Sequence, residues 1–176
     1  ILEGLVFVND GQVLTIEPGT VVRFRAGQAE NASALIVSRG GKIMANGTRE
    51  EPIIFTSEND DLMGSVPKEA RALWGGLIIL GNAPLNVEGG EASIEGIPFA
   101  EPRGIYGGVD EKDDSGVLRY VSIRHGGTNI GEGNEINGLT LGGVGSNTEI
   151  DFVEVISNED DGVEIFGGTV NLEHMV

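Results

Sequence analysis

The sequence predicts an all-β solenoid, a fold in which short strands coil around one axis and each coil buries its apolar face against the next. Two internal repeats carry this prediction. Val117–His125 reads again as Glu149–Ser157, with the same order of apolar, polar and aromatic positions, and more faintly as Val170–Val176. A second unit, Asn137–Gly143, returns as Asp161–Gly168. Repeats with a period of about 20 to 25 residues, with Gly-rich corners between short apolar runs, are typical of solenoids.

The first part of the chain contains a related unit. Val13–Phe24 and Ala34–Ala45 each hold an aliphatic run, a corner built on glycine and a second run, and their spacing predicts that they are successive coils. Pro52–Ser57 and Gly75–Gly81 add runs of strand length bounded by Pro and Gly. The only helix-like pattern, Pro67–Trp74, is too short for a stable helix and is expected to be loop.

The composition agrees with this interpretation, because glycine accounts for 29 of the 176 residues. Glycine supplies the positive φ angles that tight corners need, and Val and Ile suit a half-buried pleated surface. We expect a single domain over residues 1–176, with one long inserted loop at 82–116. Coils of roughly 22 residues, about 4.8 Å apart, would then number about six and form a stack about 30 Å tall. The loop is expected to cover the coils, through Phe99, Ile105 and Tyr106, or to bind a partner.

Alternation within the second copy of the repeat predicts which side chains face the core. The inward set is expected to be Ile150, Phe152, Val153 and Val155. Since Phe152 and Val153 are adjacent, the alternation slips by one residue there and predicts a bend. The residues expected to face solvent are Arg119, Ser122, Asp151 and Glu154.

Six motifs, taken in order, resemble a known family: Leu14–Val22, Ala34–Thr48, Leu73–Asn86, Ser115–Gly127, Asn134–Ser146 and Asp160–Asn171. They are similar to motifs of secreted bacterial proteins with the right-handed parallel β-helix of the pectin-lyase-like fold. The resemblance covers nearly the whole chain and implies this fold and a secreted or cell-surface location in bacteria. It supplies no catalytic signature. Members are longer, so a chain that begins at Ile1 and stops at Val176 within a predicted strand is expected to be a portion of a longer polypeptide.

The chain is strongly acidic, with a formal net charge of −17, and most of the excess lies in its second half. Nucleic acids and anionic membrane surfaces attract clustered Lys and Arg, so neither is expected as a partner. No apolar run is long enough to insert into a membrane. Cysteine is absent, which excludes disulfides and thiolate metal sites. Cations are the natural counter-partners of such a chain.

Three acidic clusters offer the hard oxygen ligands that calcium prefers. They are Glu58, Asp60 and Asp61; Asp110, Glu111, Asp113 and Asp114; and Asn158, Glu159, Asp160 and Asp161. None has the spacing of an EF-hand loop. The last of the three is the best candidate for a calcium site because it lies at a predicted coil corner rather than in a free loop.

An enzyme on this scaffold would need reactive groups on an outward row. A uronate lyase uses calcium with an Arg or Lys base, for which Arg119 and Arg124 are candidates, and His125 ends the same strand. A hydrolase needs paired carboxylates, for which Asp151 and Glu164 are candidates. An anionic substrate would be repelled by the negative second half of the chain. His125 is expected to close a corner through a backbone hydrogen bond, and His174 to pack in the aromatic position of its repeat.

These observations favour an extracellular or cell-surface structural or adhesive protein, with a filament or surface-layer component as one form of it. Self-association head to tail would join the edge at Leu5–Val8 of one molecule to the edge near Val176 of another. Polysaccharide is the other expected partner. The alternative is a carbohydrate-active enzyme, a polysaccharide lyase or hydrolase, on the same scaffold.

Overall fold

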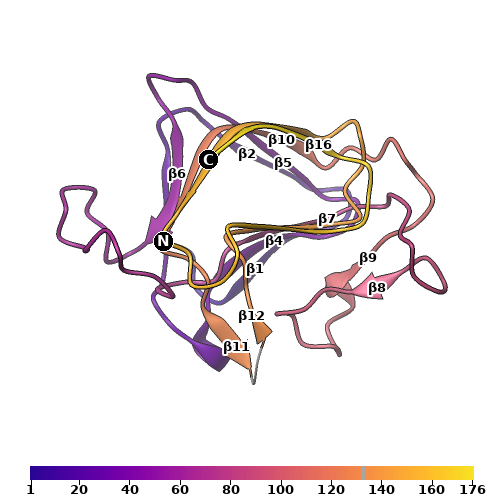
Figure 1. Cartoon of the computed structure of the whole chain (residues 1–176), viewed down its shortest axis with the longest axis horizontal. Coiled ribbons are helices and arrows are strands. Elements are labelled where there is room, and N and C mark those ends of the chain that lie inside the picture. The colour runs from indigo at the N-terminus through magenta and orange to yellow at the C-terminus, as the bar shows by residue number, and fades with distance from the viewer. Residues whose placement is uncertain (132–133) are drawn as a thin grey trace.

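The computed structural model describes residues 1–131 and 134–176, in which parallel strands wind around one apolar core (Figure 1). One side of the coil is a five-stranded sheet in the order β1-β4-β7-β13-β15. Its strands are β1 (Leu5–Val8), β4 (Ala34–Val37), β7 (Leu77–Leu80), β13 (Leu139–Gly142) and β15 (Val163–Phe166). Every neighbouring pair in this sheet is parallel.

The other sides are formed by a seven-stranded sheet whose main path is β16-β14-β10-β5-β2, with β3 and β6 beside it. Its strands are β2 (Val13–Ile16), β3 (Val21–Phe24), β5 (Lys42–Asn46), β6 (Ile53–Ser57), β10 (Gly116–Arg124), β14 (Glu149–Ile156) and β16 (Asn171–Met175). These pairs are parallel as well, so the predicted all-β stack of parallel coils is confirmed.

The remaining elements are short and lie in the connections. They are the 3₁₀ turns η1 (Ala29–Asn31) and η2 (Pro102–Gly104), the antiparallel pair β8 (Ala92–Ser93) and β9 (Ile105–Tyr106), and the antiparallel pair β11 (Asn129–Gly131) and β12 (Asn134–Glu135). Residues 67–74 form no regular helix, as expected. Within residues 1–131 and 134–176, no helix has the length and apolar character needed to cross a membrane.

The register of the C-terminal repeats is the predicted one. Leu118 pairs with Ile150, and Ile150 pairs with Leu172, so the three copies of the repeat lie on top of one another. Stacked copies of one apolar position form a continuous inner row. The copies are similar in sequence because each coil must bury its apolar row against the next.

The two motifs aligned in the first part of the chain lie in successive coils, but their residues do not pair as that alignment would place them. Val13 pairs with Lys42 rather than with Ala34, because Ala34 pairs with Leu5. The two aligned motifs therefore begin on different strands of their coils, β2 in the first and β4 in the second. Both strands carry apolar runs that end at a glycine corner, so the pattern alone does not distinguish them.

The spacing between paired residues also departs from a uniform 22. Leu139 pairs with Val163, 24 positions on, whereas Leu5 pairs with Ala34, 29 positions on. The larger spacings arise because connections of different length separate the strands. The five-stranded sheet contains one strand from each of five coils, whereas about six coils were predicted.

The seven-stranded sheet turns a corner within its long strands. The first half of β10 pairs with β5, and Val121–Ile123 pairs with β6, so one strand covers two sides of the coil (Figure 1). Tyr120, at the junction, has a φ of 47°. A left-handed residue redirects the strand, which allows Leu118 and Val121 both to point into the core. The predicted bend is thus present.

The three central strands of the five-stranded sheet, β4, β7 and β13, are buried on both faces. Leu77 and Ile79 point into the core of the coil, while Ile78 and Leu80 point outward into a second apolar cluster. The continuous apolar sequence of β7 follows from this double burial. The second cluster is completed by residues of the segment between β7 and β10, chiefly Ile94, Ile97 and Tyr106. This segment lies against the outside of the sheet (Figure 1).

The apolar residues expected to anchor this segment are only partly the right ones. Tyr106 is buried, but Phe99 is 91% exposed and Ile105 is 36% exposed. Polar contacts add to the anchoring. Arg39 donates to the Gly107 carbonyl at 2.7 Å, and the Arg103 guanidinium lies 3.7 Å from the centroid of the Phe7 ring. The segment is therefore a covering layer held at several points.

Gly116, where β10 begins, shows how closely the backbones approach. Its φ is +109°, and a Cβ there would lie 2.0 Å from the carbonyl oxygen of Ile43 on β5. Only glycine combines this conformation with this contact. It allows the chain to re-enter the stack after the long excursion.

Candidate functional site

The outward face of the seven-stranded sheet carries a polar row across three coils. Arg119 on β10 pairs in register with Asp151 on β14, which pairs with Glu173 on β16. Equivalent positions in stacked parallel strands lie about 4.8 Å apart, so these side chains are direct neighbours. The predicted solvent-facing positions Arg119 and Asp151 are therefore on one row. Glu173 extends that row.

Both arginines proposed as catalytic bases are engaged by carboxylates. Arg119 Nε lies 3.5 Å from Asp151 Oδ2 and 3.8 Å from Glu149 Oε1. On the next side of the coil, Arg124 Nη2 lies 3.5 Å from Glu154 Oε1. These pairs cross from coil to coil, so each arginine neutralises charge that would otherwise repel its neighbours.

Ser122 lies beneath the second pair and was expected to be exposed, but it is buried. It donates from Oγ to Glu154 Oε1 at 2.6 Å and accepts from Arg124 Nε at 2.8 Å. The two long side chains fold over it. Alternation in the sequence correctly predicted that Ser122 points outward. It did not predict that Arg124 and Glu154 cover Ser122, because the strand register brings these side chains together.

A ladder of stacked rings runs along the bend of the same sheet. Tyr120 and Phe152 have ring centroids 4.6 Å apart, and Phe152 and His174 have centroids 4.2 Å apart with planes 1° from parallel. All three residues have positive φ angles between 47° and 52°. That conformation costs about 1–2 kcal/mol per residue, and aromatic stacking of about 0.5–1.5 kcal/mol per pair offsets part of this cost.

The ladder corrects the predicted place of one residue and confirms that of another. Phe152 does not point into the core: it is half-buried at the bend and stacks between its two neighbours. The alternation slips at Phe152 itself, because the left-handed backbone turns its side chain out of the inner row. His174 does pack in the aromatic position of its repeat.

Two hollows flank this region. One, of about 220 Å³, lies along the ladder and is lined by Pro52, Ser122, Glu154 and Val176 as well as the three rings. The other, of about 360 Å³, is polar and is lined by Asn147, Glu149, Asp151, Asn171 and Glu173 among others. His174 contributes to the first hollow, and Asp151 and Glu173 contribute to the second.

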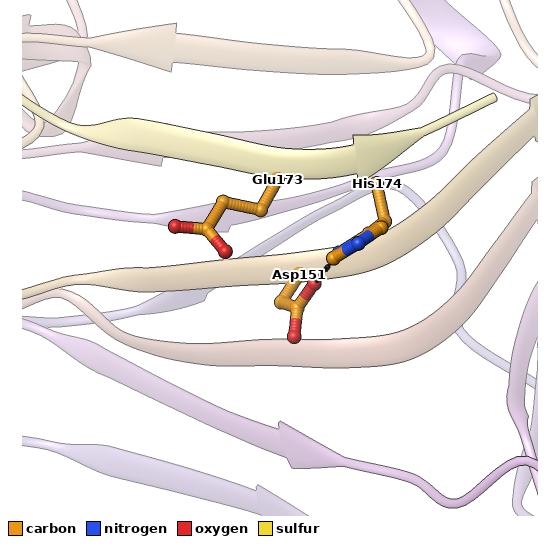
Figure 2. A group of neighbouring side chains, drawn as sticks. All are labelled: Asp151, Glu173 and His174. Carbon is orange, nitrogen blue, oxygen red and sulfur yellow. Dashed lines mark hydrogen bonds and ion pairs between the residues drawn. The ribbon is translucent and has the colours of Figure 1, made fainter.

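Asp151, Glu173 and His174, which line these hollows, bring three potential metal ligands together. Figure 2 shows the three side chains on neighbouring strands. One ligand atom from each residue lies within 4.8 Å of the other two. His174 Nδ1 is 2.8 Å from Asp151 Oδ1, while the other carboxylate oxygen lies 3.5 Å from Arg119 Nε. In the described part of the chain this Arg119 nitrogen has no hydrogen-bond partner. Among the described residues, this is the group with metal-ligand spacing.

The predicted calcium cluster at Asn158–Asp161 has a different environment. Glu159 lies 2.6 Å from Arg71 Nε, and the Asn158 side-chain amide donates to the backbone carbonyl of Asp161 at 2.8 Å. The carboxylates of Asp160 and Asp161 are on exposed residues. A calcium site here stays a prediction. To bind the ion, the Glu159 carboxylate would have to give up its ion pair with Arg71.

The other two acidic clusters hold backbone and side-chain donors. Asp60 is buried and accepts from Thr56 Oγ1 and the Leu62 N–H, both at 2.8 Å. Asp113 is also buried and accepts from the Asn82 side-chain amide and from Ser115 Oγ. These carboxylates are therefore occupied in fixing the loops that contain them.

The remaining catalytic candidates are not assembled as a pair. His125 is buried, and its Nδ1 contacts the Ala70 carbonyl oxygen at 2.5 Å, so it closes a corner through a backbone contact as expected. Asp151 is on β14 and Glu164 is on β15, which belong to different sheets. The pairing of these two carboxylates for hydrolysis is therefore wrong.

Glu164 lies instead under the covering segment. Burial, reinforced by the nearby Glu95 carboxylate, raises the pKa of Glu164 above its ordinary value. The same burial and the charges of Glu95 and Glu164 raise the pKa of Tyr106. The buried Asn137 amide donates to Glu164 Oε2, while the Asn137 side-chain oxygen has no hydrogen-bond partner in the described part of the chain. Glu164 is thus partly buried beside a second carboxylate, that of the exposed residue Glu95.

Sequence reasoning missed Glu173 and Glu95. A signal for Glu173 was present, because the aligned repeats place it at the position of Asp151. No such signal exists for Glu95, since its proximity to Glu164 depends on the path of the covering segment.

Comparison with known proteins identifies the family to which the chain belongs. The chain matches the pectate-lyase-like β-helix domain over residues 1–176. Comparisons with curated proteins and with solved structures gave no significant match. The matched region and the register of parallel coils agree with each other. The chain therefore belongs to the family of pectate-lyase-like β-helix domains.

Proposed function

We propose that the chain is a structural or adhesive β-helix of the cell surface or extracellular space, and that its outward faces serve contact rather than catalysis. The observation that carries this proposal is the pairing of both candidate bases. Arg119 and Arg124 are each held against carboxylates of the next coil. A base must be free to take a proton, and an arginine that binds uronate must be free to take its carboxylate.

The charge of the molecular surface supports the same proposal. Seven of the eleven Lys and Arg residues form ion pairs within the described part of the chain: Arg25, Arg39, Lys42, Arg71, Arg103, Arg119 and Arg124. The surplus is negative, which disfavours capture of an anionic polysaccharide and favours cations or neutral glycans. Stacked rings along the bend would offer apolar edges to a neutral glycan.

Head-to-tail association is the form of assembly that we propose for it. Strands β15 and β16 are at one end of the two sheets, and β1 and β2 are at the other. Edge strands carry backbone donors and acceptors that can pair with a second parallel coil. Contacts of this kind do not close and would build a fibre.

Assembly and binding are tested on the purified chain by analytical ultracentrifugation, electron microscopy and co-sedimentation with insoluble neutral and acidic polysaccharides. We expect concentration-dependent rods or retention on a neutral glycan. A monodisperse monomer that binds none of the polysaccharides would contradict the proposal.

A carbohydrate-active enzyme is the second candidate, and one observation favours it. Asp151 and Glu173 line a polar hollow of about 360 Å³ beside Arg119, on the outward row that such an enzyme would use. Its test is the release of unsaturated or reducing ends from a polysaccharide panel with calcium present. Turnover that is lost in both Arg119→Ala and Asp151→Asn would replace the structural proposal with this one.

A further inference from the structure

We propose that Asp151, Glu173 and His174 form a binding site for a divalent transition-metal ion of the zinc class, bridging strands β14 and β16. The set contains one imidazole nitrogen and two carboxylates. Zn²⁺ and related ions accept this mixture, whereas Ca²⁺ takes oxygen ligands almost exclusively. The site therefore differs in chemistry from the acidic corner at Asn158–Asp161.

The imidazole is held in position before any ion arrives. His174 stacks on Phe152 with planes 1° from parallel, and its backbone φ is 48°, as at the other two ring positions. Stacking fixes the plane of the ring, and the 2.8 Å contact from Nδ1 to Asp151 Oδ1 keeps the imidazole beside the carboxylate, so that Zn²⁺ binds by displacing the proton that the two groups share to solvent. A ligand that is already ordered loses little entropy when it binds a metal.

The Asp151 carboxylate is oriented as well. Arg119 Nε lies 3.5 Å from Oδ2, which leaves Oδ1 directed at the imidazole. Such outer partners orient metal ligands in many sites. Arg119 also places a positive charge nearby, but Asp151, Glu173 and Glu149 together outweigh it. The local field is therefore negative.

Glu173 supplies the adjustable ligand. Its residue is exposed and its carboxylate extends from β16 toward the level of Asp151 (Figure 2). The three ligand atoms lie within 4.8 Å of one another, and bond lengths of about 2.0–2.2 Å require somewhat shorter separations. A rotation of the Glu173 side chain brings them into range. Three protein ligands leave further positions open to water or to a partner's ligand atom.

The repeat itself provides a matched variant. The equivalents of His174 are Tyr120 and Phe152, so His174→Phe keeps an aromatic ring on the ladder and removes only the nitrogen ligand. Glu173→Gln removes the second carboxylate. Glu17→Gln is the control, because it removes one negative charge from an exposed residue that follows β2, at the other end of the seven-stranded sheet.

The experiment is calorimetric titration of the purified chain with ZnCl₂, with CaCl₂ as the comparison ion, together with NMR of the imidazole resonances. We expect about one Zn²⁺ per chain, a shift of the His174 resonances on binding, and a rise in the melting temperature. Affinity should fall about tenfold to a hundredfold in His174→Phe and Glu173→Gln and stay within about twofold in Glu17→Gln. Calcium should not move the His174 resonances.

Two results would overturn the proposal: no saturable zinc binding by the unsubstituted chain, or unchanged affinity in a folded His174→Phe. If that variant does not fold, the His174 resonances of the unsubstituted chain decide the question, since zinc held elsewhere would leave them unmoved. Because assembly and glycan binding are measured separately, failure of this site leaves the structural proposal standing.

Discussion

The indole of Trp74 lies flat on the ring of Phe24, with centroids 4.0 Å apart and planes 13° from parallel, and both side chains are fully buried. Trp74 also donates from Nε1 to the Arg124 carbonyl at 2.7 Å. It therefore joins the core to the strand that carries the outward ion pair. Trp74 comes from a loop between β6 and β7, yet it fills the centre of the coil.

Trp74→Phe should lower the free energy of unfolding by about 1–3 kcal/mol, because the Arg124 carbonyl loses a buried donor. Trp74→Ala should lower it by about 3–5 kcal/mol through the cavity it leaves. Urea denaturation followed by circular dichroism measures both. An unchanged free energy of unfolding in Trp74→Phe would mean that the hydrogen bond contributes nothing.

The covering segment should depend on Tyr106 and not on Phe99. Tyr106→Ala removes a ring buried against the outer face of the five-stranded sheet and should cost about 3 kcal/mol. Phe99→Ala, at a side chain 91% exposed, should change stability by less than about 0.5 kcal/mol. Limited proteolysis within 82–116 gives a second readout. Faster cleavage in the Phe99 variant alone would contradict this assignment.

Stability should fall as the pH rises through the raised pKa of Glu164. Burial and Glu95 disfavour its ionised form in the folded chain. Its contribution is therefore fully present below the ordinary carboxyl range and is lost as the pH passes the folded-state pKa. Glu164→Gln should raise the melting temperature at neutral pH and flatten this dependence. Glu50→Gln, on an exposed residue, is the control and should leave the pH profile unchanged.

Calcium should raise the melting temperature, because a net charge of −17 repels itself within a compact stack. A chelator should reverse the rise. Monovalent salt at equal ionic strength separates general screening from specific binding. If Asn158–Asp161 holds the ion, Asp161→Asn should abolish the calcium effect and leave the salt effect intact. An unchanged melting temperature in all conditions would leave these carboxylates as solvated surface.

The sequence allowed the architecture to be predicted where repeats are close and alike. The pairing of Leu118 with Ile150 could be read directly, because both belong to copies that share aromatic and apolar positions. The pairing of Val13 with Lys42 could not, since every strand of the first coils is a short aliphatic run. Apolar character predicts burial but does not say which of several similar strands is the neighbour.

Part of the candidate site could be predicted from the sequence, and part of it could not. Arg119 and Asp151 were placed on an outward row by alternation alone. The contact between His174 Nδ1 and Asp151 required the ladder geometry, in which a left-handed residue turns the ring out of the core. The carboxylate pair at Glu164 required the path of a segment that has no counterpart in the repeat.

The excursion between β7 and β10 also has a consequence for how fast the molecule folds. Gly116 pairs with Ile43, so the seven-stranded sheet can grow past β5 only after a loop of many residues has closed. Loop closure costs entropy before any pairing compensates for it, and proteins dominated by such distant contacts fold slowly. Among the described strands, β13 and β15 and the strands β14 and β16 pair over much shorter separations. We therefore expect the C-terminal coils to form before the sheet is joined across the excursion to β5.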